Sequence, residues 1–455
     1  MLDDYLIMLY PLVPVVHRPS FRESLASKRE VEDSDFLALI FAICAAVIGT
    51  MPSKFQQYRR HTPPLPFATR KDMLNRCHTL LLDARRPSYF DEISFQKWAT
   101  SYLMVIASFG VGEHNRARMT EVESMQLGRL LHFHRLSEYE GLNPIEVQLR
   151  KKGFWLLFYG YVHSHVQNLR KERLTFLDPE ILDSIDLEAL MPLDVDDEGI
   201  SEHAVVSQSS PDACLTSGFI IHSRIFWKAL QGKPRGGDDS IHHCSHSQHR
   251  DQQFDNVRKR LHELKYALNG IPSRLHAWAP QAQVDHSDGS EDSTNVVRTQ
   301  FATMRANLHV THLWLQSVLL DQLDVLAQEE RRPQDTSASL ATVEARWTER
   351  ENLCSQLLHV LHSIPQEHVE PNGLHLAYKV RDVAVGLFSC PFEPDDPASL
   401  RAGEYVRCFT DLLSRLDGSE TVNTTNLQSW VDIDRERKRH TSEYAISDSS
   451  WLGWA

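Results

Sequence analysis

Residues 121–178 decide the fold, and they read EVESMQLGRLLHFHRLSEYEGLNPIEVQLRKKGFWLLFYGYVHSHVQNLRKERLTFLD. Two amphipathic segments flank a polar break at residues 141–144. Apolar side chains occupy most faces of the second segment: Phe154, Trp155, Leu157, Phe158, Tyr159, Tyr161, Val162 and Val166. A helix that is apolar on most sides is buried on most sides. The sequence therefore predicts that this helix runs through the centre of a helical array, with Trp155 in the core.

The rest of the chain shows helical periodicity and almost no strand-like alternation. Apolar residues repeat at steps of three and four within residues 257–271, 301–318, 353–364, 377–387 and 406–416. Polar segments, rich in Ser, Gly, His or acidic residues, separate these helices at residues 201–217, 232–250 and 281–295. The pattern predicts an all-α fold, a large multi-helix array with long polar loops. We expect one domain over residues 1–418 and a loosely structured tail over residues 419–455.

The most apolar run covers residues 36–51, FLALIFAICAAVIGTM. It carries no charge, but its 16 residues fall short of the roughly 20 that a membrane span needs. The first residues are acidic, whereas a secretory signal begins with a basic region. We interpret the run as a buried core helix and expect no membrane partner.

Net charge and cysteine spacing disfavour some kinds of binding site and indicate a cellular compartment. The net charge of −13 repels phosphate backbones, so we predict that this polypeptide alone does not bind specific DNA. The seven cysteines stand far apart and form no Cys-x-x-Cys pair. This spacing disfavours a disulfide framework and a structural zinc cluster, and fits a reducing intracellular compartment.

Two motifs have both a functional and a plain interpretation. The run His242, His243, Cys244, His246 and His249 offers metal-ligand side chains, but its Gly- and Ser-rich surroundings favour a polar loop over a metal site. Residues 127–131, LGRLL, fit a Leu-x-x-Leu-Leu pattern of co-regulator helices. The same leucine spacing is typical of a core helix, which is the interpretation we adopt.

Two basic segments also have both a functional and a plain interpretation. Arg150, Lys151 and Lys152 fit a phosphate contact or an import signal, but Glu146 stands four residues before Arg150, as in a helical ion pair. We expect a solvated helix face there. Residues 434–440, DRERKRH, are the better import candidate, and an exposed helix end of mixed charge is an equal alternative.

Signatures of catalysis are missing from the sequence. There is no Gly-x-Ser-x-Gly, no phosphate-binding Gly-x-x-x-x-Gly-Lys, no dinucleotide-binding glycine pattern and no His-Glu-x-x-His. We predict that the protein is not an enzyme and assign no catalytic, cofactor-binding or metal residues.

Three motifs together carry a family resemblance. They are YPLVPVVHRPSF at residues 10–21, RKK at residues 150–152 before the aromatic block, and MPLDVDD at residues 191–197. In order and spacing they resemble the regulatory middle homology domain of fungal zinc-cluster transcription factors, most strongly over residues 1–200. The chain departs from the family pattern at Tyr161, where an Asp is common, and at residues 171–173, where Gly-Arg-Pro is usual. Nothing in it matches the six-cysteine DNA-binding module of the family.

The resemblance implies a regulator of RNA polymerase II genes in the nucleus, whose helical domain controls an activation function, often in response to a small-molecule effector. It implies homo- or heterodimers with zinc-cluster factors. Zinc and DNA contact would belong to the six-cysteine module, so we expect no cofactor within this chain. Either the chain is truncated or it acts without its own DNA reader. The alternative function is an interaction protein that modulates a full-length relative by dimerisation.

One further expectation concerns the end of the chain. Residues 443–455 read EYAISDSSWLGWA and interleave acidic with aromatic residues. Acidic groups keep such aromatics in water, where they can anchor in a coactivator groove. The equal alternative is that Trp451 and Trp454 fold back and cap the helical domain.

Overall fold

The computed structural model describes residues 1–166, 177, 181, 185–206, 213–230, 246–278, 291–329 and 336–416. Over these residues the secondary structure is helical, and the sole β-pairing is an isolated bridge between Ile200 and Val205. The predicted all-α fold is confirmed. The His-rich run around His242, the basic segment at 434–440 and the tail from 419 lie wholly or largely outside the described residues.

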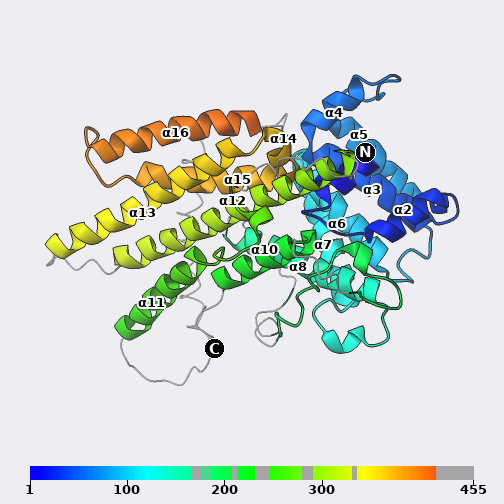
Figure 1. The fold of residues 1–455 in the computed structure, drawn as a ribbon, viewed down its shortest axis with the longest axis horizontal. Coiled ribbons are helices and arrows are strands. Elements are labelled where there is room, and N and C mark those ends of the chain that lie inside the picture. Colours follow the sequence, from blue (N-terminus) through cyan, green and yellow to red (C-terminus); the bar gives the residue numbers. More distant parts are fainter. Residues whose placement is uncertain are drawn as a thin grey trace, which may run out of the picture.

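The first half of the chain forms one end of the elongated molecule (Figure 1). Its α-helices are α1 Leu2–Asp4, α2 Arg18–Ala26, α3 Ser34–Thr50, α4 Pro52–Arg59, α5 Arg70–Ala84, α6 Phe95–Gly110, α7 His114–Leu130 and α8 Pro144–Val166. Shorter helical turns are η1 Tyr5–Leu9, η2 Arg29–Val31, η3 Leu136–Tyr139 and η4 Asp197–Gly199.

The second half supplies the long helices, which lie roughly along the long axis (Figure 1). They are α10 Leu215–Leu230, α11 His246–Lys265, α12 Glu291–Glu329, α13 Thr336–Ser363, α14 Gln366–Val369, α15 Gly373–Val385 and α16 Pro397–Leu416. The turns here are η5 Ser273–Leu275, η6 Glu370–Asn372 and η7 Gly386–Ser389. The predicted helices are confirmed, but some of their last residues lie beyond the helix ends: Leu268 and Ile271 follow α11, Ile364 follows α13, and Leu387 lies in η7. The predicted polar segments are too long at their C-terminal ends, because α10, α11 and α12 begin at Leu215, His246 and Glu291.

Helix α3 is the buried core helix that its composition predicts. Asp33 caps its N-terminus by accepting hydrogen bonds from the backbone N–H groups of Asp35 and Phe36, at 2.9 and 3.0 Å. The helix packs mainly against α5 and α6. By length and hydropathy, none of the described helices qualifies singly as a membrane span, while α3 and α4 together pass that test as a pair bent by 106°.

Helices α3 and α6 approach each other closely at two glycines. A Cβ on Gly49 would lie 2.7 Å from Cα of Ala107, and a Cβ on Gly110 would overlap the carbonyl of Gly49. The buried Arg70 donates a hydrogen bond from Nη1 to the Gly49 carbonyl oxygen at 3.0 Å, at the C-terminal end of α3. A cation suits this position because helix C-termini carry unsatisfied carbonyl groups.

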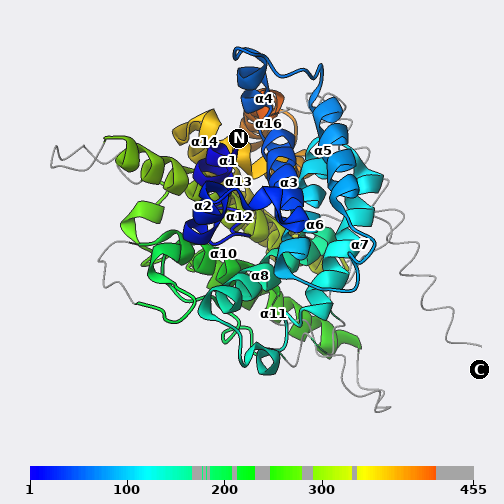
Figure 2. The same cartoon turned by 90° about the vertical axis from the view of Figure 1, so that its right-hand side faces the viewer.

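Helix α12 connects the two halves of the molecule. It packs against α10, α11, α13 and α15, and also against the N-terminal turn η1. Gln300 Nε2 donates a hydrogen bond to the carbonyl oxygen of Leu6 at 3.0 Å. Figure 2, viewed from the N-terminal end, shows α1 and α2 in front of α12. The N-terminal segment and the long helices of the second half therefore share one hydrophobic core.

Candidate functional site

The three motif segments of the sequence meet at one buried carboxylate, that of Asp197. Its side chain is 2% exposed. Lys152 Nζ lies 3.0 Å from Oδ1, and the Arg18 backbone N–H donates to Oδ2 at 3.0 Å. The Tyr10 hydroxyl donates to the same Oδ2. We call these four residues the Asp197 junction; it joins the N-terminal segment, α8 and the acidic turn η4.

The residues around Arg18 explain why the entry motif has this composition. His17 caps α2 and places its Nε2 2.8 Å from the carbonyl oxygen of Asp197. The Arg18 guanidinium donates to Glu198 at 2.7 Å, and Pro19 stands in the first turn of α2, where a missing N–H costs nothing. The motif thus starts a helix and presents two polar side chains to η4.

The electrostatics of the junction favour an ionised Asp197. Burial by itself would raise its pKa, but the charge of Lys152, the Tyr10 hydroxyl and the groups of Arg18 outweigh burial and lower the pKa well below 3.8. Burial and the same carboxylate raise the pKa of Tyr10, so its hydroxyl stays a donor. Asp197 and Lys152 form a buried ion pair to which Tyr10 and Arg18 add hydrogen bonds, an arrangement that suits a structural clamp better than proton transfer.

The predicted solvated face at the basic triplet is wrong. Lys152 is 3% exposed, and Lys151 Nζ donates to the carbonyl oxygens of Ala189 and Met191 at 2.8 and 3.2 Å. Arg150 does form the predicted ion pair with Glu146, at 2.8 Å. The spacing of four residues predicted the pair of Glu146 and Arg150. The partners of the two lysines could not be predicted in this way, because they lie some 40 residues further along the chain.

Trp155 confirms the prediction of a central helix. It is fully buried, and its Nε1 donates to the carbonyl oxygen of Leu190 at 3.1 Å. The LGRLL motif is also explained by packing, because Leu127 and Leu131 are buried. Leu130 is 48% exposed, so the three leucines do not form one exposed face.

A second buried polar group, which the sequence analysis missed, surrounds Lys379 of α15. Its Nζ donates to Thr311 Oγ1 at 2.7 Å and lies 5.6 and 5.5 Å from the ring centroids of Phe226 and Trp314. His222 Nε2 lies 3.3 Å from the same Thr311 oxygen. Four helices contribute, since His163 of α8 stacks on Trp314 at 5.3 Å. We call Lys379, Thr311, His222, His163 and Trp314 the Lys379 cluster.

Burial dominates the electrostatics of the Lys379 cluster. It lowers the pKa of Lys379 to about 7. Burial, and then the charge of Lys379, lower the pKa values of His163 and His222. His163 Nδ1 lies 2.7 Å from the Tyr159 carbonyl oxygen, whereas its buried Nε2 has no hydrogen-bond partner among the described residues. A signal existed in the sequence, because Lys379 follows Leu376 by three and precedes Val383 by four on an apolar helix face.

Residues suited to metal binding do not come together in the described part of the chain. It holds no group of three or more His, Cys, Asp or Glu side chains placed to bind an ion. Six cysteines are described, and all are free: Cys44, Cys77, Cys214, Cys354, Cys390 and Cys408. The prediction that no catalytic, cofactor or metal residue is present stays a prediction.

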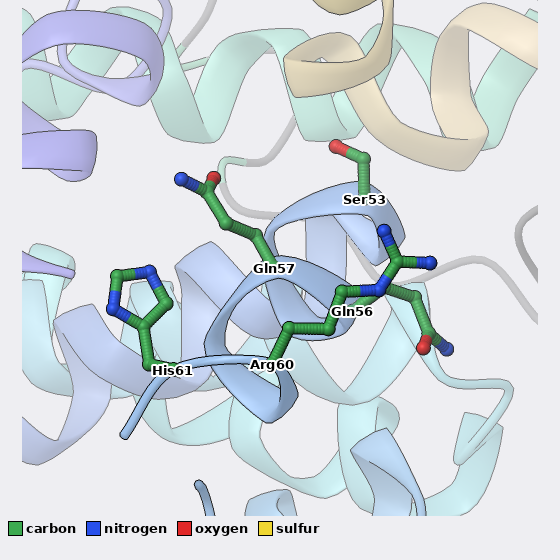
Figure 3. Close-up of a pocket in the computed structure, with 5 residues that line it drawn as sticks. All are labelled: Ser53, Gln56, Gln57, Arg60 and His61. Atoms are coloured by element: carbon green, nitrogen blue, oxygen red, sulfur yellow. The ribbon is translucent and has the colours of Figure 1, made fainter. Parts of the chain in front are cut away.

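An open hollow of about 500 Å³ lies on α4. Figure 3 shows its lining, formed by Ser53, Gln56, Gln57, Arg60 and His61. Glu370 accepts a hydrogen bond from the Ser53 backbone N–H at 2.7 Å, at the start of α4. The lining holds no paired acid and base, so the hollow indicates no reaction.

The family model of the fungal specific transcription factor domain matches residues 2–268, more than half of the chain. The chain therefore belongs to this family of transcription factors, as the three motifs predict. Searches of curated proteins and of solved structures gave no match. The Asp197 junction lies inside the matched region, whereas Lys379, Thr311 and Trp314 lie beyond it.

Proposed function

We propose that this chain regulates the transcription of RNA polymerase II genes in a fungal nucleus and that its helical domain responds to an effector. The match of residues 2–268 to a transcription factor family carries the proposal. The family consists of transcription regulators rather than enzymes, in keeping with a chain that lacks catalytic motifs. The proposal assigns no cofactor to these residues.

The Asp197 junction suits a structural clamp, whereas the Lys379 cluster offers a buried polar group on which a response of the core could depend. Networks of buried polar groups form or break together, because each unpaired member is costly in a low dielectric. Such a core has few intermediate arrangements, and an effector that binds one arrangement better shifts the populations. The Lys379 cluster is the better candidate for this response, because no carboxylate among the described residues forms an ion pair with Lys379, whereas Asp197 pairs with Lys152.

A reporter assay tests the proposal. The full chain is fused to a heterologous DNA-binding domain, and transcription from an RNA polymerase II promoter is measured in a fungal host. We expect the fusion to change transcription relative to the DNA-binding domain alone. A fused chain with Trp155→Ala, whose core should not form, serves as the matched control. Equal output from the fusion and the bare DNA-binding domain would count against the proposal.

The net charge of −13 favours a second candidate function, in which the chain acts on DNA only through a partner. The partner would be a zinc-cluster factor that dimerises with it. A gel-shift assay at physiological salt should show no sequence-selective binding by the purified chain. Co-purification of the tagged chain with a full-length zinc-cluster factor tests dimerisation, and the absence of any such complex would speak against this function.

Two proposals concern residues outside the described structure. Residues 434–440 would direct nuclear import, and changing their basic residues to Ala should reduce nuclear fluorescence of a tagged chain. Residues 443–455 would bind a coactivator. Fused alone to a DNA-binding domain, they should activate a reporter more strongly than the Trp451→Ala/Trp454→Ala form, and equal output would exclude this role.

A further inference from the structure

Helix α7 has an apolar outer face, whereas a surface helix normally turns its charged residues to solvent. Six of its residues are exposed, and none of them is Lys, Arg, Asp or Glu: His114, Asn115, Met119, Val122, Gln126 and Leu130. The charged residues of α7 are all half-buried instead. Met119 is 73% exposed, Val122 46% and Leu130 48%, and their spacing of three and eight residues places them on one side of the helix.

Helix α5 extends this apolar face. The two helices lie side by side (Figure 2), because Arg116 of α7 donates to Asn75 of α5 at 2.7 Å and Arg85, just after α5, pairs with Glu123 at 2.6 Å. Leu82 is 46% exposed and lies one turn before Arg85, on the side of α5 that meets α7. The apolar residues of both helices therefore lie along the same contact. We call Leu82, Met119, Val122 and Leu130 the α5–α7 strip.

The charges that border the α5–α7 strip are mainly positive. They belong to Arg86, Arg116, Arg118 and Arg129, against Asp83 and Glu121. Glu123 does not add to the negative side, because Arg85 neutralises it. A chain with a net charge of −13 thus has a local positive excess around an exposed apolar strip. Charge complementarity favours an acidic partner that carries apolar anchors.

We infer that the α5–α7 strip is a docking surface for residues 441–455 of the same chain. This segment, TSEYAISDSSWLGWA, has two acidic residues and no Lys or Arg. Trp451, Leu452 and Trp454 pack on the strip, while Glu443 and Asp448 lie against its arginines. The inference rests on the proposed function and deepens it, because a docked segment cannot offer the same aromatic residues to a coactivator.

The size and charge of the strip favour this occupant over a second copy of the chain. A second copy that used the same face would place positive borders opposite each other, which is costly. The strip has four apolar side chains, whereas a stable interface between proteins involves about 20–30 residues on each side. A segment of the same chain needs far less contact, because its tether keeps it at an effective concentration on the order of millimolar.

The chain leaves the described structure at the end of the molecule where α5 begins. The Arg415 carbonyl oxygen, near the end of α16, accepts a hydrogen bond from Gln366 of α14 at 2.9 Å. The turn after α14 bonds to the start of α4, and the start of α5 bonds to the end of α3, which α4 follows. Thirty-four residues separate Leu416 from Trp451. They reach up to roughly 110 Å when fully extended, whereas α5 is only about 22 Å long.

Binding of a labelled peptide tests the docking on full-length chains. The probe is a fluorescein-labelled peptide of residues 441–455, and binding is followed by fluorescence anisotropy. A chain with Trp451→Ala/Trp454→Ala, the open chain, should bind the peptide because its own segment no longer covers the strip. The wild-type chain should bind it at least about tenfold more weakly, because its own segment competes.

Substitutions in the strip connect this binding to the named residues. Adding Met119→Gln/Val122→Thr to the open chain should weaken peptide binding about tenfold or more, because two apolar contacts are lost. The matched control makes similar changes at exposed apolar residues on other helices, Val325→Thr/Leu400→Gln, and should leave binding unchanged. Exposed substitutions of this kind affect stability little, and thermal melts of each variant check this.

A photo-crosslinker locates the segment in the otherwise wild-type chain. Leu452→p-benzoylphenylalanine is introduced into the full chain, and crosslinked peptides are identified by mass spectrometry after irradiation. We expect crosslinks to residues 79–90 or 115–130 of the same chain.

The inference is overturned if the open chain does not bind the peptide, if the wild-type chain binds it equally well, or if strip and control variants bind alike. Crosslinks only to other helices, or only between two chains, also overturn it. These results are independent of the reporter assays. Docking together with a silent fusion of residues 443–455 supports the surface and refutes the coactivator role. An active fusion without docking refutes the surface and leaves the proposed function standing.

Discussion

Replacing Asp197 by Asn tests the Asp197 junction most directly, because it changes one charge and almost no volume. Tyr10 and the Arg18 N–H both donate to Oδ2, while Lys152 donates to Oδ1. An amide has one oxygen only. If that oxygen accepts from the Tyr10 hydroxyl and the Arg18 N–H, the amide NH₂ group faces the Lys152 ammonium group. In the opposite orientation the NH₂ group faces the Tyr10 hydroxyl and the Arg18 N–H, which are both donors.

Either orientation leaves a buried ammonium group without its counter-charge. Lys152 and Asp197 are 3% and 2% exposed, so solvent screens them little. Removing one partner of a buried ion pair typically costs about 3–5 kcal/mol. We therefore expect Asp197→Asn to lower the free energy of unfolding by an amount in that range. Adding Lys152→Met should recover part of the loss, because the uncompensated charge is removed.

Urea unfolding followed by tryptophan fluorescence measures this effect, with Glu198→Gln as the control. Glu198 also pairs with Arg18, at 2.7 Å, but its side chain is 47% exposed. Exposed ion pairs contribute about 0–1 kcal/mol, so the control should stay near the wild type. If Asp197→Asn and Glu198→Gln lower the stability equally, or if Lys152→Met gives no recovery, the junction is not the clamp described above.

Trp155→Ala should lower stability by about 3–5 kcal/mol, and an unchanged thermal transition would disprove the central position of α8. Gly110→Ala should destabilise by more than the helix propensity of Ala gains, because its Cβ overlaps the Gly49 carbonyl; a stabilised variant in thermal melts would contradict this close approach. Burial lowers the pKa of Lys379 from 10.5 to about 7, so the unfolded state holds the proton that the folded state loses. Stability should therefore rise between pH 7 and 10.5. Lys379→Met should remove this slope and gain on the order of 4 kcal/mol at pH 7, which urea midpoints across this range would check.

Features that depend on residue spacing within a single helix could be predicted from the sequence. The apolar run of α3, the aromatic faces around Trp155 and the ion pair of Glu146 with Arg150 all follow from spacings within one helix. The same reasoning fails at Lys152, because its partner Asp197 lies 45 residues away and Tyr10 lies further still. A charged residue next to an apolar helical block looks the same in the sequence whether its charge is solvated by water or paired with a carboxylate far along the chain.

The Lys379 cluster was missed for a different reason. Lys379 stands among apolar residues in α15, which marks it as unusual, but the histidines that surround it come from α8 and α10. A single sequence does not place helices that are more than 150 residues apart. The family resemblance did not help either, because the matched region ends at residue 268.

Helix α8 joins the two clusters, and this leads to a final prediction. Lys152 and His163 are eleven residues apart on one continuous helix, about 16 Å at the usual rise per residue. If α8 transmits strain between its ends, Asp197→Asn and Lys379→Met should not act independently. Distant sites usually add within about 0.5 kcal/mol, so we expect the double variant to deviate from additivity by more than this. The cycle is measured by urea unfolding at pH 7, with Glu198→Gln in place of Asp197→Asn as its control. Additive effects in both cycles would show that the two clusters are energetically separate and that α8 carries no signal between them.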